Sequence, residues 1–182
     1  MLKGARGADN VTQEVESAEL TGNIRARDVR LRDVEEGDLP MFFEQQLDPE
    51  ANHMAAFTAK DPADRMAFEA HWAKILGDAT ITLKTILFGD HIAGSVLSHA
   101  WFGKPEVSYW LGRQYWGRGI ATKALSEFLG YVTVRPLYAR SAKDNVASLR
   151  VLAKCGFVIS GEDKGFANAR GEDVEEFILE LR

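Results

Sequence analysis

Two glycines in the stretch from Gln114 to Thr122 mark a place where the chain is suited to hold an anion. The stretch follows a strand-like run, residues 107–111, and precedes a helix-like run that begins at Ile120. The first amides of a helix have no acceptor inside it, and the positive end of the helix dipole points the same way. Gly117 and Gly119 allow close backbone approach and turns that a side chain forbids. The spacing predicts a site for a phosphate-bearing ligand; the alternative is that the glycines only redirect the chain.

Two familiar phosphate-binding loops fit this stretch poorly. A P-loop has the pattern Gly-x-x-x-x-Gly-Lys-Ser/Thr, whose lysine reaches the outer phosphates of a nucleotide, and no such lysine follows Gly119. A dinucleotide loop has the pattern Gly-x-Gly-x-x-Gly, and Thr122 stands where its third glycine belongs. The strands before the loop also read as antiparallel rather than as a βαβ repeat. The pattern therefore disfavours both nucleoside triphosphates and dinucleotides.

Length, composition and charge favour one globular domain that binds neither nucleic acid nor membrane. The chain has 182 residues, 46% of them apolar, and a formal net charge of -5. A surface with this charge is not expected to bind nucleic acid, and it tolerates amine substrates. Cys155 is the single cysteine, which excludes an intramolecular disulfide and suits a reducing compartment. With no signal-peptide core and no apolar run of membrane-spanning length, the predicted location is cytoplasmic.

The elements that position the loop are expected within residues 28–182, after a flexible or loosely docked extension over residues 1–27. Asp38 is a plausible cap for the first helix, and Pro62 suits the start of the second. The predicted order is a strand at 29–32, helices at 41–46 and 62–76 with a loop at 51–59, strands at 81–87, 91–100 and 106–111, the glycine loop, a helix at 120–132, a strand at 137–141, a helix capped by Asn145 and ended by Gly156, and strands at 157–160 and 175–181.

The loop and this element order resemble the GCN5-related N-acetyltransferases, the GNAT family. Residues 114–119 match the family pattern Gln/Arg-x-x-Gly-x-Gly/Ala, and the order of elements over about residues 29–182 is that of the family. The resemblance implies an α+β fold with three α/β/α layers, in which helices flank a mixed, mostly antiparallel central sheet. Residues 29–32, 107–122 and 145–157 are similar to the Rim-type branch, whose founding members acetylate the N-terminal amine of ribosomal proteins. In the last segment the shared pattern is Asn-x-x-Ser followed by Lys-x-Gly-Phe.

This resemblance implies an N-acetyltransferase that moves an acetyl group from acetyl-coenzyme A (acetyl-CoA) to a primary amine by direct attack in a ternary complex. The acceptor would be a protein N-terminus or a small-molecule amine, and no metal is expected. The resemblance also makes a homodimer an expectation, because members of the family form dimers. An alternative function is a non-catalytic module of the same fold that binds or senses acyl-CoA. Thiol release with a panel of amines distinguishes the two.

The resemblance also assigns roles to residues around the loop. Amides of the loop would hold the pyrophosphate of the cofactor, backbone groups of the preceding strand would hold its pantetheine arm, and one strand amide would polarise the thioester carbonyl. Arg118 adds charge or is simply solvated, and Asn145 combines a helix cap with a contact to the cofactor or substrate path. The predicted cofactor-binding residues are Tyr109, Trp110, Leu111, Gln114, Gly117, Arg118, Gly119, Ile120, Ala121, Thr122, Asn145 and Ser148.

Two side chains are predicted to be catalytic. Many acetyltransferases carry a tyrosine four residues after the serine position as the proton donor; here that residue is Leu152, which leaves Ser148 or water to protonate the thiolate. Glu106 is the candidate general base, and its alternative is an exposed glutamate at a strand start. Histidines 53, 71, 91 and 99 are eligible bases by type, without a supporting motif.

Other chemistry-bearing residues are expected to be structural. Cys155 reads as a small core residue because no histidine stands near it to activate the thiol, and no metal-ligand spacing occurs. Met54 and Phe57 lie in the region that walls the acceptor site in the family, whereas Phe68 and Trp72, four residues apart, are expected in the core.

Overall fold

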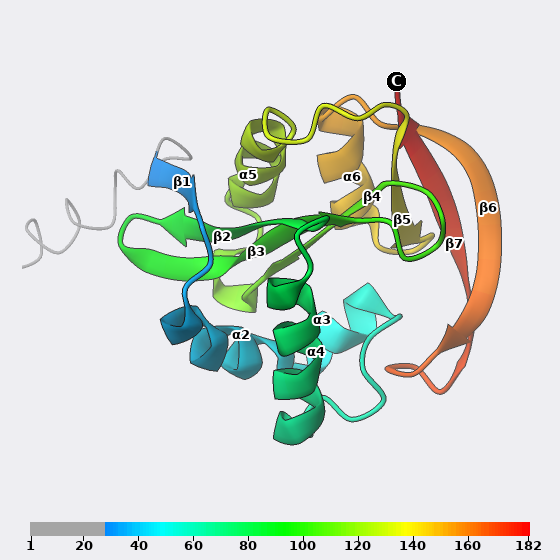
Figure 1. Ribbon diagram of the computed structural model, residues 1–182. Coiled ribbons are helices and arrows are strands. Elements are labelled where there is room, and N and C mark those ends of the chain that lie inside the picture. The colour runs from blue at the N-terminus through cyan, green and yellow to red at the C-terminus, as the bar shows by residue number, and fades with distance from the viewer. Residues whose placement is uncertain (1–27) are drawn as a thin grey trace, which may run out of the picture.

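The computed structural model describes residues 28–182, so the prediction for residues 1–27 lies outside the described part of the chain. A seven-stranded sheet with the order β1-β2-β3-β4-β5-β7-β6 forms its centre (Figure 1). Every neighbouring pair of strands is antiparallel except β4 and β5. The strands are β1 (Val29–Arg32), β2 (Thr82–Phe88), β3 (His91–His99), β4 (Glu106–Leu111), β5 (Leu137–Ala142), β6 (Val158–Ala167) and β7 (Glu172–Leu181).

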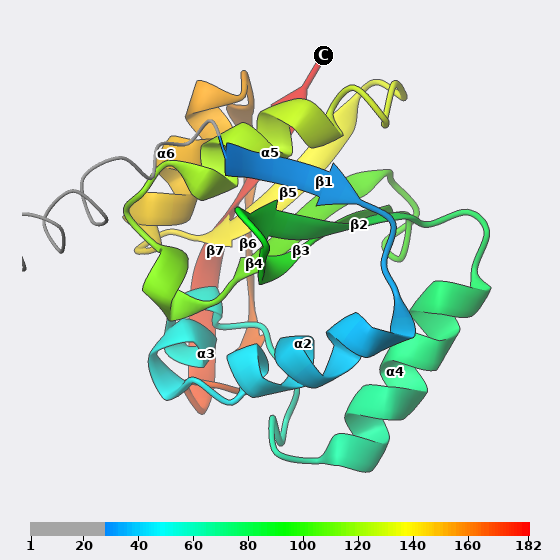
Figure 2. The ribbon, with the colours of Figure 1, turned by 90° about the vertical axis from the view of Figure 1, so that its left-hand side faces the viewer.

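Helices cover both faces of this sheet (Figures 1 and 2). Helices α5 and α6 lie on one face, and α2, α3 and α4 lie on the other. The helices are α2 (Leu39–Gln46), α3 (Pro49–Ala55), α4 (Arg65–Gly77), α5 (Ile120–Phe128) and α6 (Val146–Lys154), with 3-10 turns η2 (Glu36–Asp38) and η3 (Arg113–Tyr115). The predicted α+β fold of three layers is confirmed. In the described residues no helix is both long and apolar enough to cross a membrane.

The strands alternate in facing, so each layer of helices has its own apolar core. The larger core joins the sheet to α5 and α6 and includes Val96, Val107 and Phe128. The smaller one joins α2 and α4 to the sheet through an aromatic group in which Phe42 stacks on Trp72 at 4.9 Å between ring centroids. Phe68 and Trp72 are therefore core residues, as the sequence predicts.

Helix α3 occupies residues 51–55 of the loop expected over residues 51–59, and only residues 56–59 are without helix. The Asp48 side chain accepts hydrogen bonds from the amides of Glu50 and Ala51, each at 3.0 Å, and Pro49 occupies the first turn of α3. The same Asp-Pro-Glu sequence that ends α2 thus also starts a new helix. The prediction was wrong here because signals for a helix end and a helix start coincide.

Two predicted caps are also corrected. The second helix, α4, begins at Arg65 rather than at Pro62, and Asp64 caps it by accepting from the amide of Ala67 at 2.9 Å. Asp38 precedes α2, but its side chain makes no cap hydrogen bond to that helix. Its carboxylate is buried and accepts from both terminal nitrogens of Arg32, at 2.7 and 2.6 Å, and from the hydroxyl of Thr85 at 2.6 Å. Asp38 therefore joins β1, β2 and the turn before α2.

Candidate active site

The glycine loop lies between β4 and α5, as predicted. Gly117 and Gly119 have positive φ angles of 71° and 76°, so a side chain would be strained at either position. No atom lies within 4 Å of a Cβ added at Gly117, which leaves open space on the loop. The first backbone bond of α5 runs from the amide of Lys123 to the carbonyl of Gly119 at 3.1 Å. The amides of Ile120, Ala121 and Thr122 precede that bond and have no acceptor within the helix.

Side chains around the loop fix its position. Arg113 bonds to Asp48 at 2.7 Å and to Glu50 at 3.0 Å, which ties η3 to the start of α3. The indole nitrogen of Trp116 donates to the carbonyl of Leu111 at 3.0 Å. Arg118 is exposed, and its guanidinium lies over the ring of Phe88 on β2 at 4.4 Å.

The side chain of Gln114 lies against the backbone before the loop. A Cβ added at Gly112 would come within 3.0 Å of the Gln114 Oε1 atom and 3.2 Å of the Gln45 side chain. Gln45 is buried, and its Nε2 donates to the carbonyl of Ile92 at 3.0 Å. The glutamine of the predicted motif therefore packs over the junction of β4 and η3, which the sequence pattern alone does not reveal.

Strands β4 and β5 pair only at Glu106 and Tyr138 and then separate. The amide of Gly112 donates to the carbonyl of Ala93 at 2.9 Å, so alternate residues of β4 from that point bond to β3. By this alternation the backbone groups of Tyr109 and Leu111 face the gap toward β5. These groups form an edge of β4 that β5 does not pair with beyond Glu106.

The backbone of Trp110 does not lie on this edge, where the sequence predicted it. Its carbonyl oxygen would lie 1.9 Å from a Cβ at Gly94, which places the Trp110 backbone against β3 rather than against the gap. The Trp110 side chain faces the α2–α4 side of the sheet by strand alternation, and its buried indole nitrogen has no hydrogen-bond partner among residues 28–182. Only a side-chain contact is available from Trp110.

Helix α6 begins on the other side of the gap, directly after β5. The Asn145 side chain caps it by accepting from the amide of Ser148 at 3.1 Å, and its Nδ2 donates to the carbonyl of Met54 at 3.0 Å. Asn145 therefore both caps the helix, as predicted, and ties it to the end of α3. The Ser148 hydroxyl lies 2.9 Å from the phenol oxygen of Tyr109. The sequence predicted only a backbone role for Tyr109. Its phenol on the same face of the strand as Val107 and Leu111 could have indicated a buried polar group there.

Burial keeps the Tyr109 phenol protonated. It raises the pKa of Tyr109 to about 12, against which the hydrogen bond with Ser148 acts. Leu152, at the position where many acetyltransferases carry tyrosine, is 1% exposed and belongs to the core between α6 and the sheet. The hydroxyls of Tyr109 and Ser148 carry protons on this side of the gap. Cys155, which packs on the same core as Tyr109, adds a thiol whose Sγ lies 3.6 Å from the carbonyl of Thr122.

Glu106 is buried, which corrects the alternative of an exposed strand-start residue. Its carboxylate lies 3.4 Å from Nε of Arg140 on β5. Arg140 bonds more closely to Glu176, at 2.7 Å, and to Asp163, at 2.9 Å. The Arg140 contact is the one hydrogen bond that residues 28–182 give to the Glu106 side chain, so Glu106 is the loosest partner in this group. Strand alternation puts it on the face opposite Tyr109.

Charge and burial oppose one another in this group. Burial raises the pKa of Glu176, and the bonds from Arg140 act against that rise. Burial lowers the pKa of Arg140, but the hydrogen bonds that Arg140 donates to Asp163 and Glu176 outweigh this and raise it. One cation is thus shared among three carboxylates, and the group has an excess of negative charge on the α2–α4 side of the sheet.

Of the four histidines only His99 is buried, and Cys155 is half-buried. His99 is buried, stacks on Trp101 at 3.9 Å, and has a pKa lowered by burial to about 4, so it is neutral near pH 7. Burial also lowers the pKa of His71. Burial raises the pKa of the Cys155 thiol, as expected for an unactivated core residue. Among residues 28–182, no three His, Cys, Asp or Glu side chains cluster closely enough to hold a metal ion.

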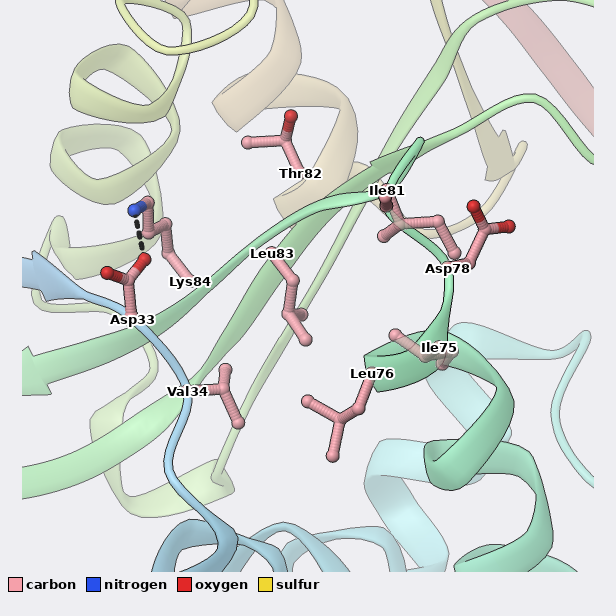
Figure 3. Close-up of a pocket in the computed structure, with 10 residues that line it drawn as sticks. Asp33, Val34, Ile75, Leu76, Asp78, Ile81, Thr82, Leu83 and Lys84 are labelled. Atoms are coloured by element: carbon pink, nitrogen blue, oxygen red, sulfur yellow. Dashed lines mark hydrogen bonds and ion pairs between the residues drawn. The ribbon is translucent and has the colours of Figure 1, made fainter.

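A hollow of about 330 Å³ lies elsewhere, between the end of α4 and strand β2 (Figure 3). Its wall includes Leu76, Leu83 and an ion pair between Asp33 and Lys84. None of the residues predicted for the site lines it. The site defined by the loop, the gap and the first turn of α6 is an extended edge rather than this hollow.

Comparison with known proteins agrees with this geometry. The family model for the acetyltransferase (GNAT) domain matches residues 28–158, and the chain belongs to this family. The predicted family is thereby confirmed. The uncharacterized N-acetyltransferase p20 of Bacillus licheniformis is 25% identical over 83 residues, which are 43% of this chain and 47% of that protein. The match thus spans about half the length of this curated relative.

Solved structures share the fold, and Rim-type enzymes are among them. RimJ of Mycobacterium smegmatis, in complex with CoA-disulfide, has a TM-score of 0.70 at 21% identity, with 84% of this chain and 81% of that chain covered. RimL, a ribosomal L7/L12 α-N-protein acetyltransferase solved with coenzyme A, has a TM-score of 0.67 at 17% identity, with 83% and 93% covered. The spermidine N-acetyltransferase of Vibrio cholerae, in complex with CoA and spermine, has 0.67 at 19%, with 85% and 96% covered.

Proposed function

We propose that this protein is an N-acetyltransferase that moves an acetyl group from acetyl-CoA to a primary amine. The observation that carries the proposal is the meeting of three features along one gap. The free amides at the start of α5 offer an anion site, the unpaired edge of β4 offers backbone partners for an extended arm, and α6 places a hydroxyl across from that edge. A pyrophosphate joined to an amide-bearing arm and a thioester fits these features in that order.

Each part of the site then has a role in the transfer. Amides of Arg118 to Thr122 hold the pyrophosphate, and the open space at Gly117 gives it room. Backbone groups of Tyr109 and Leu111 hold the arm, except that the Leu111 carbonyl is already engaged by Trp116. A β4 amide polarises the thioester carbonyl, and holding both reactants in one gap supplies much of the acceleration. Ser148 donates a proton to the leaving thiolate.

The acceptor amine approaches from the α2–α4 side of the sheet. Glu106 faces that side, is buried and has one long contact to Arg140, so it accepts the amine proton through a water molecule. Met54 and Phe57 wall this approach at the end of α3. The side-chain Nδ2 of Asn168 donates to the carbonyl of Thr58 at 2.9 Å, which ties that wall to the β6–β7 hairpin. The excess of carboxylates favours a cationic amine, whether a protein N-terminus or a small molecule.

A second candidate is a module that binds acyl-CoA without turnover. The buried Leu152 favours it, because the tyrosine that donates a proton in many acetyltransferases is missing. Release of free thiol from acetyl-CoA, measured with peptides, polyamines and amino acids as acceptors, separates the two functions. Binding of acetyl-CoA with no thiol release by any acceptor would favour the module.

A matched pair of glycine variants tests whether the glycine loop binds acetyl-CoA. Gly117 and Gly103 have φ angles of 71° and 75°, and neither has an atom within 4 Å of an added Cβ. Alanine therefore strains the backbone similarly in both variants, at a cost of about 1 kcal/mol. We expect Gly117→Ala alone to weaken acetyl-CoA binding, by a factor of about ten or more in the dissociation constant, which is ~1.4 kcal/mol. Equal affinities in the two variants would remove the loop from the proposed site.

A further inference from the structure

The Tyr109 phenol and the Ser148 hydroxyl form a polar pair inside an otherwise apolar layer. The two oxygens lie 2.9 Å apart, and either can donate to the other. Tyr109 packs against the core shared by the sheet and helices α5 and α6, together with Leu149. The pair is partly buried, and each hydroxyl is the hydrogen-bond partner of the other, so it connects β4 with α6 by a path along which a proton can move.

The pair spans the gap that the arm of the cofactor is proposed to follow. Tyr109 belongs to β4, and its own backbone groups face the gap. Ser148 belongs to the first turn of α6, on the β5 side, where the side chain of Asn145 holds its amide at 3.1 Å. A thioester in the gap therefore passes the Ser148 hydroxyl, with the Tyr109 phenol directly behind it.

Resting on the proposed function, we propose that Tyr109 supplies, through Ser148, the proton that the leaving thiolate requires. As the carbon–sulfur bond breaks, its electron pair goes to sulfur and the Ser148 hydroxyl proton moves to the thiolate. The Tyr109 proton moves to the serine oxygen, which leaves a phenolate. The phenolate then regains the proton that the acceptor nitrogen released, by way of solvent. The acceptor nitrogen forms the new carbon–nitrogen bond to the acetyl group. In sum one C–S and one N–H bond are broken, and one C–N and one S–H bond are formed.

This relay explains how the chain functions without a tyrosine at position 152. Leu152 fills that place with an apolar side chain at 1% exposure, so no proton can come from it. A serine alone would be left as an alkoxide, a stronger base than a phenolate. Because burial disfavours the Tyr109 phenolate as well, the relay resets before the next turnover. The Tyr109 phenol acts through Ser148 as a positioning and proton-supplying group, and it does not itself touch the thioester.

Binding of free coenzyme A tests the relay without relying on turnover. In the relay Ser148 donates toward the sulfur and Tyr109 donates to Ser148, so the pair stabilises the bound thiolate over the thiol. The affinity for coenzyme A should therefore rise severalfold between about pH 6.5 and 9. Desulfo-coenzyme A lacks the sulfur and should bind with an affinity that does not depend on this group. In Tyr109→Phe and Ser148→Ala the rise for coenzyme A should shrink toward that of the desulfo analogue.

Turnover supplies the second readout. Tyr109→Phe should lower kcat by about tenfold or more with little change in the KM for acetyl-CoA. The double variant with Ser148→Ala should be no slower than Ser148→Ala alone, because both residues serve one proton path. Tyr131→Phe is the control, since that tyrosine is half exposed and lies under the Lys84 ammonium at 4.7 Å.

The outcomes separate this proposal from the one on which it rests. If the wild-type protein binds no coenzyme A, the proposed function fails. If it binds coenzyme A and releases thiol, but Tyr109→Phe keeps the wild-type pH dependence of binding or the wild-type kcat, only the relay is overturned. The relay is also overturned if the fold decrease in kcat of the double variant equals the product of the two single decreases, because two residues on one proton path should not act independently.

Discussion

Asn145 is expected to stabilise the protein through two separable hydrogen bonds, one inside α6 and one to α3. Its Oδ1 accepts from the amide of Ser148 at 3.1 Å, and its Nδ2 donates to the carbonyl of Met54 at 3.0 Å. A helix cap contributes about 1 kcal/mol, and a hydrogen bond such as the one to Met54 contributes about 0.5–1.5 kcal/mol. Asn145→Ala should therefore lower the free energy of unfolding by roughly 2 kcal/mol.

Two further variants divide this loss between the bonds. Asn145→Asp keeps an acceptor for the cap and places a negative charge at the helix N-terminus, worth about 0.3–1 kcal/mol, but it can no longer donate to Met54. Its stability should lie between those of Asn145→Ala and the wild type. Asp64→Ala removes a cap of the same kind from α4, where the side chain bonds to Ala67 at 2.9 Å, and should cost about 1 kcal/mol.

Thermal unfolding and acetyl-CoA binding together test the division. For a chain of this length 1 kcal/mol corresponds to a change in Tm of roughly 2–4 °C, so Asn145→Ala should lower Tm by about 4–8 °C. Both Asn145 variants should weaken acetyl-CoA binding, because α6 and the end of α3 lose their link, whereas Asp64→Ala should not. Equal Tm values for Asn145→Ala and Asn145→Asp would refute the capping contribution. Wild-type affinity in both would refute the role of the link.

Further predictions concern the sheet, the buried carboxylates and the base. Gly94→Ala should lower the free energy of unfolding by about 1–3 kcal/mol and weaken acetyl-CoA binding, because its Cβ would lie 1.9 Å from the Trp110 carbonyl oxygen and displace β4. Denaturant unfolding measures the loss, and Gly37→Ala, whose added Cβ meets open space, is the control. Burial raises the pKa of Asp38, but its hydrogen bonds lower it more, so the pKa is lower in the folded protein than in the unfolded chain. The ionised carboxylate therefore stabilises the fold at pH values above the unfolded pKa of about 3.9. This stabilisation is lost as the pH falls through the lower pKa of the folded protein. Urea unfolding of Asp38→Asn should show a lower midpoint at pH 7 and a weaker acid dependence; a wild-type midpoint would contradict the assignment. Glu106→Gln should change the pH–rate profile of thiol release, and an unaltered profile would point to another base or to none.

The parts of the molecule that the sequence predicted well are set by neighbouring residues. Strand alternation identified β1 and β4 at the residues where the structure has them, and the Gly-x-Gly spacing located the turn into α5. Asn145 was recognised as a cap because its acceptor, the amide of Ser148, is only three residues away. The segment between α2 and α4 was less clear, since Asp48 follows the end of one helix and caps the next, and the cap of α4 is Asp64.

The composition of the site was decided by the order of strands in the sheet. Tyr109 and Ser148 meet because β5, which leads into α6, lies beside β4 and then diverges from it. Glu106 is buried for the same reason, since that pairing brings Arg140 within 3.4 Å and the antiparallel β7 adds Glu176. Local sequence determined the loop that fits a pyrophosphate, because backbone conformation depends on adjacent residues. Only the tertiary structure determined which side chains share the gap, because residues distant in the chain become neighbours solely through packing.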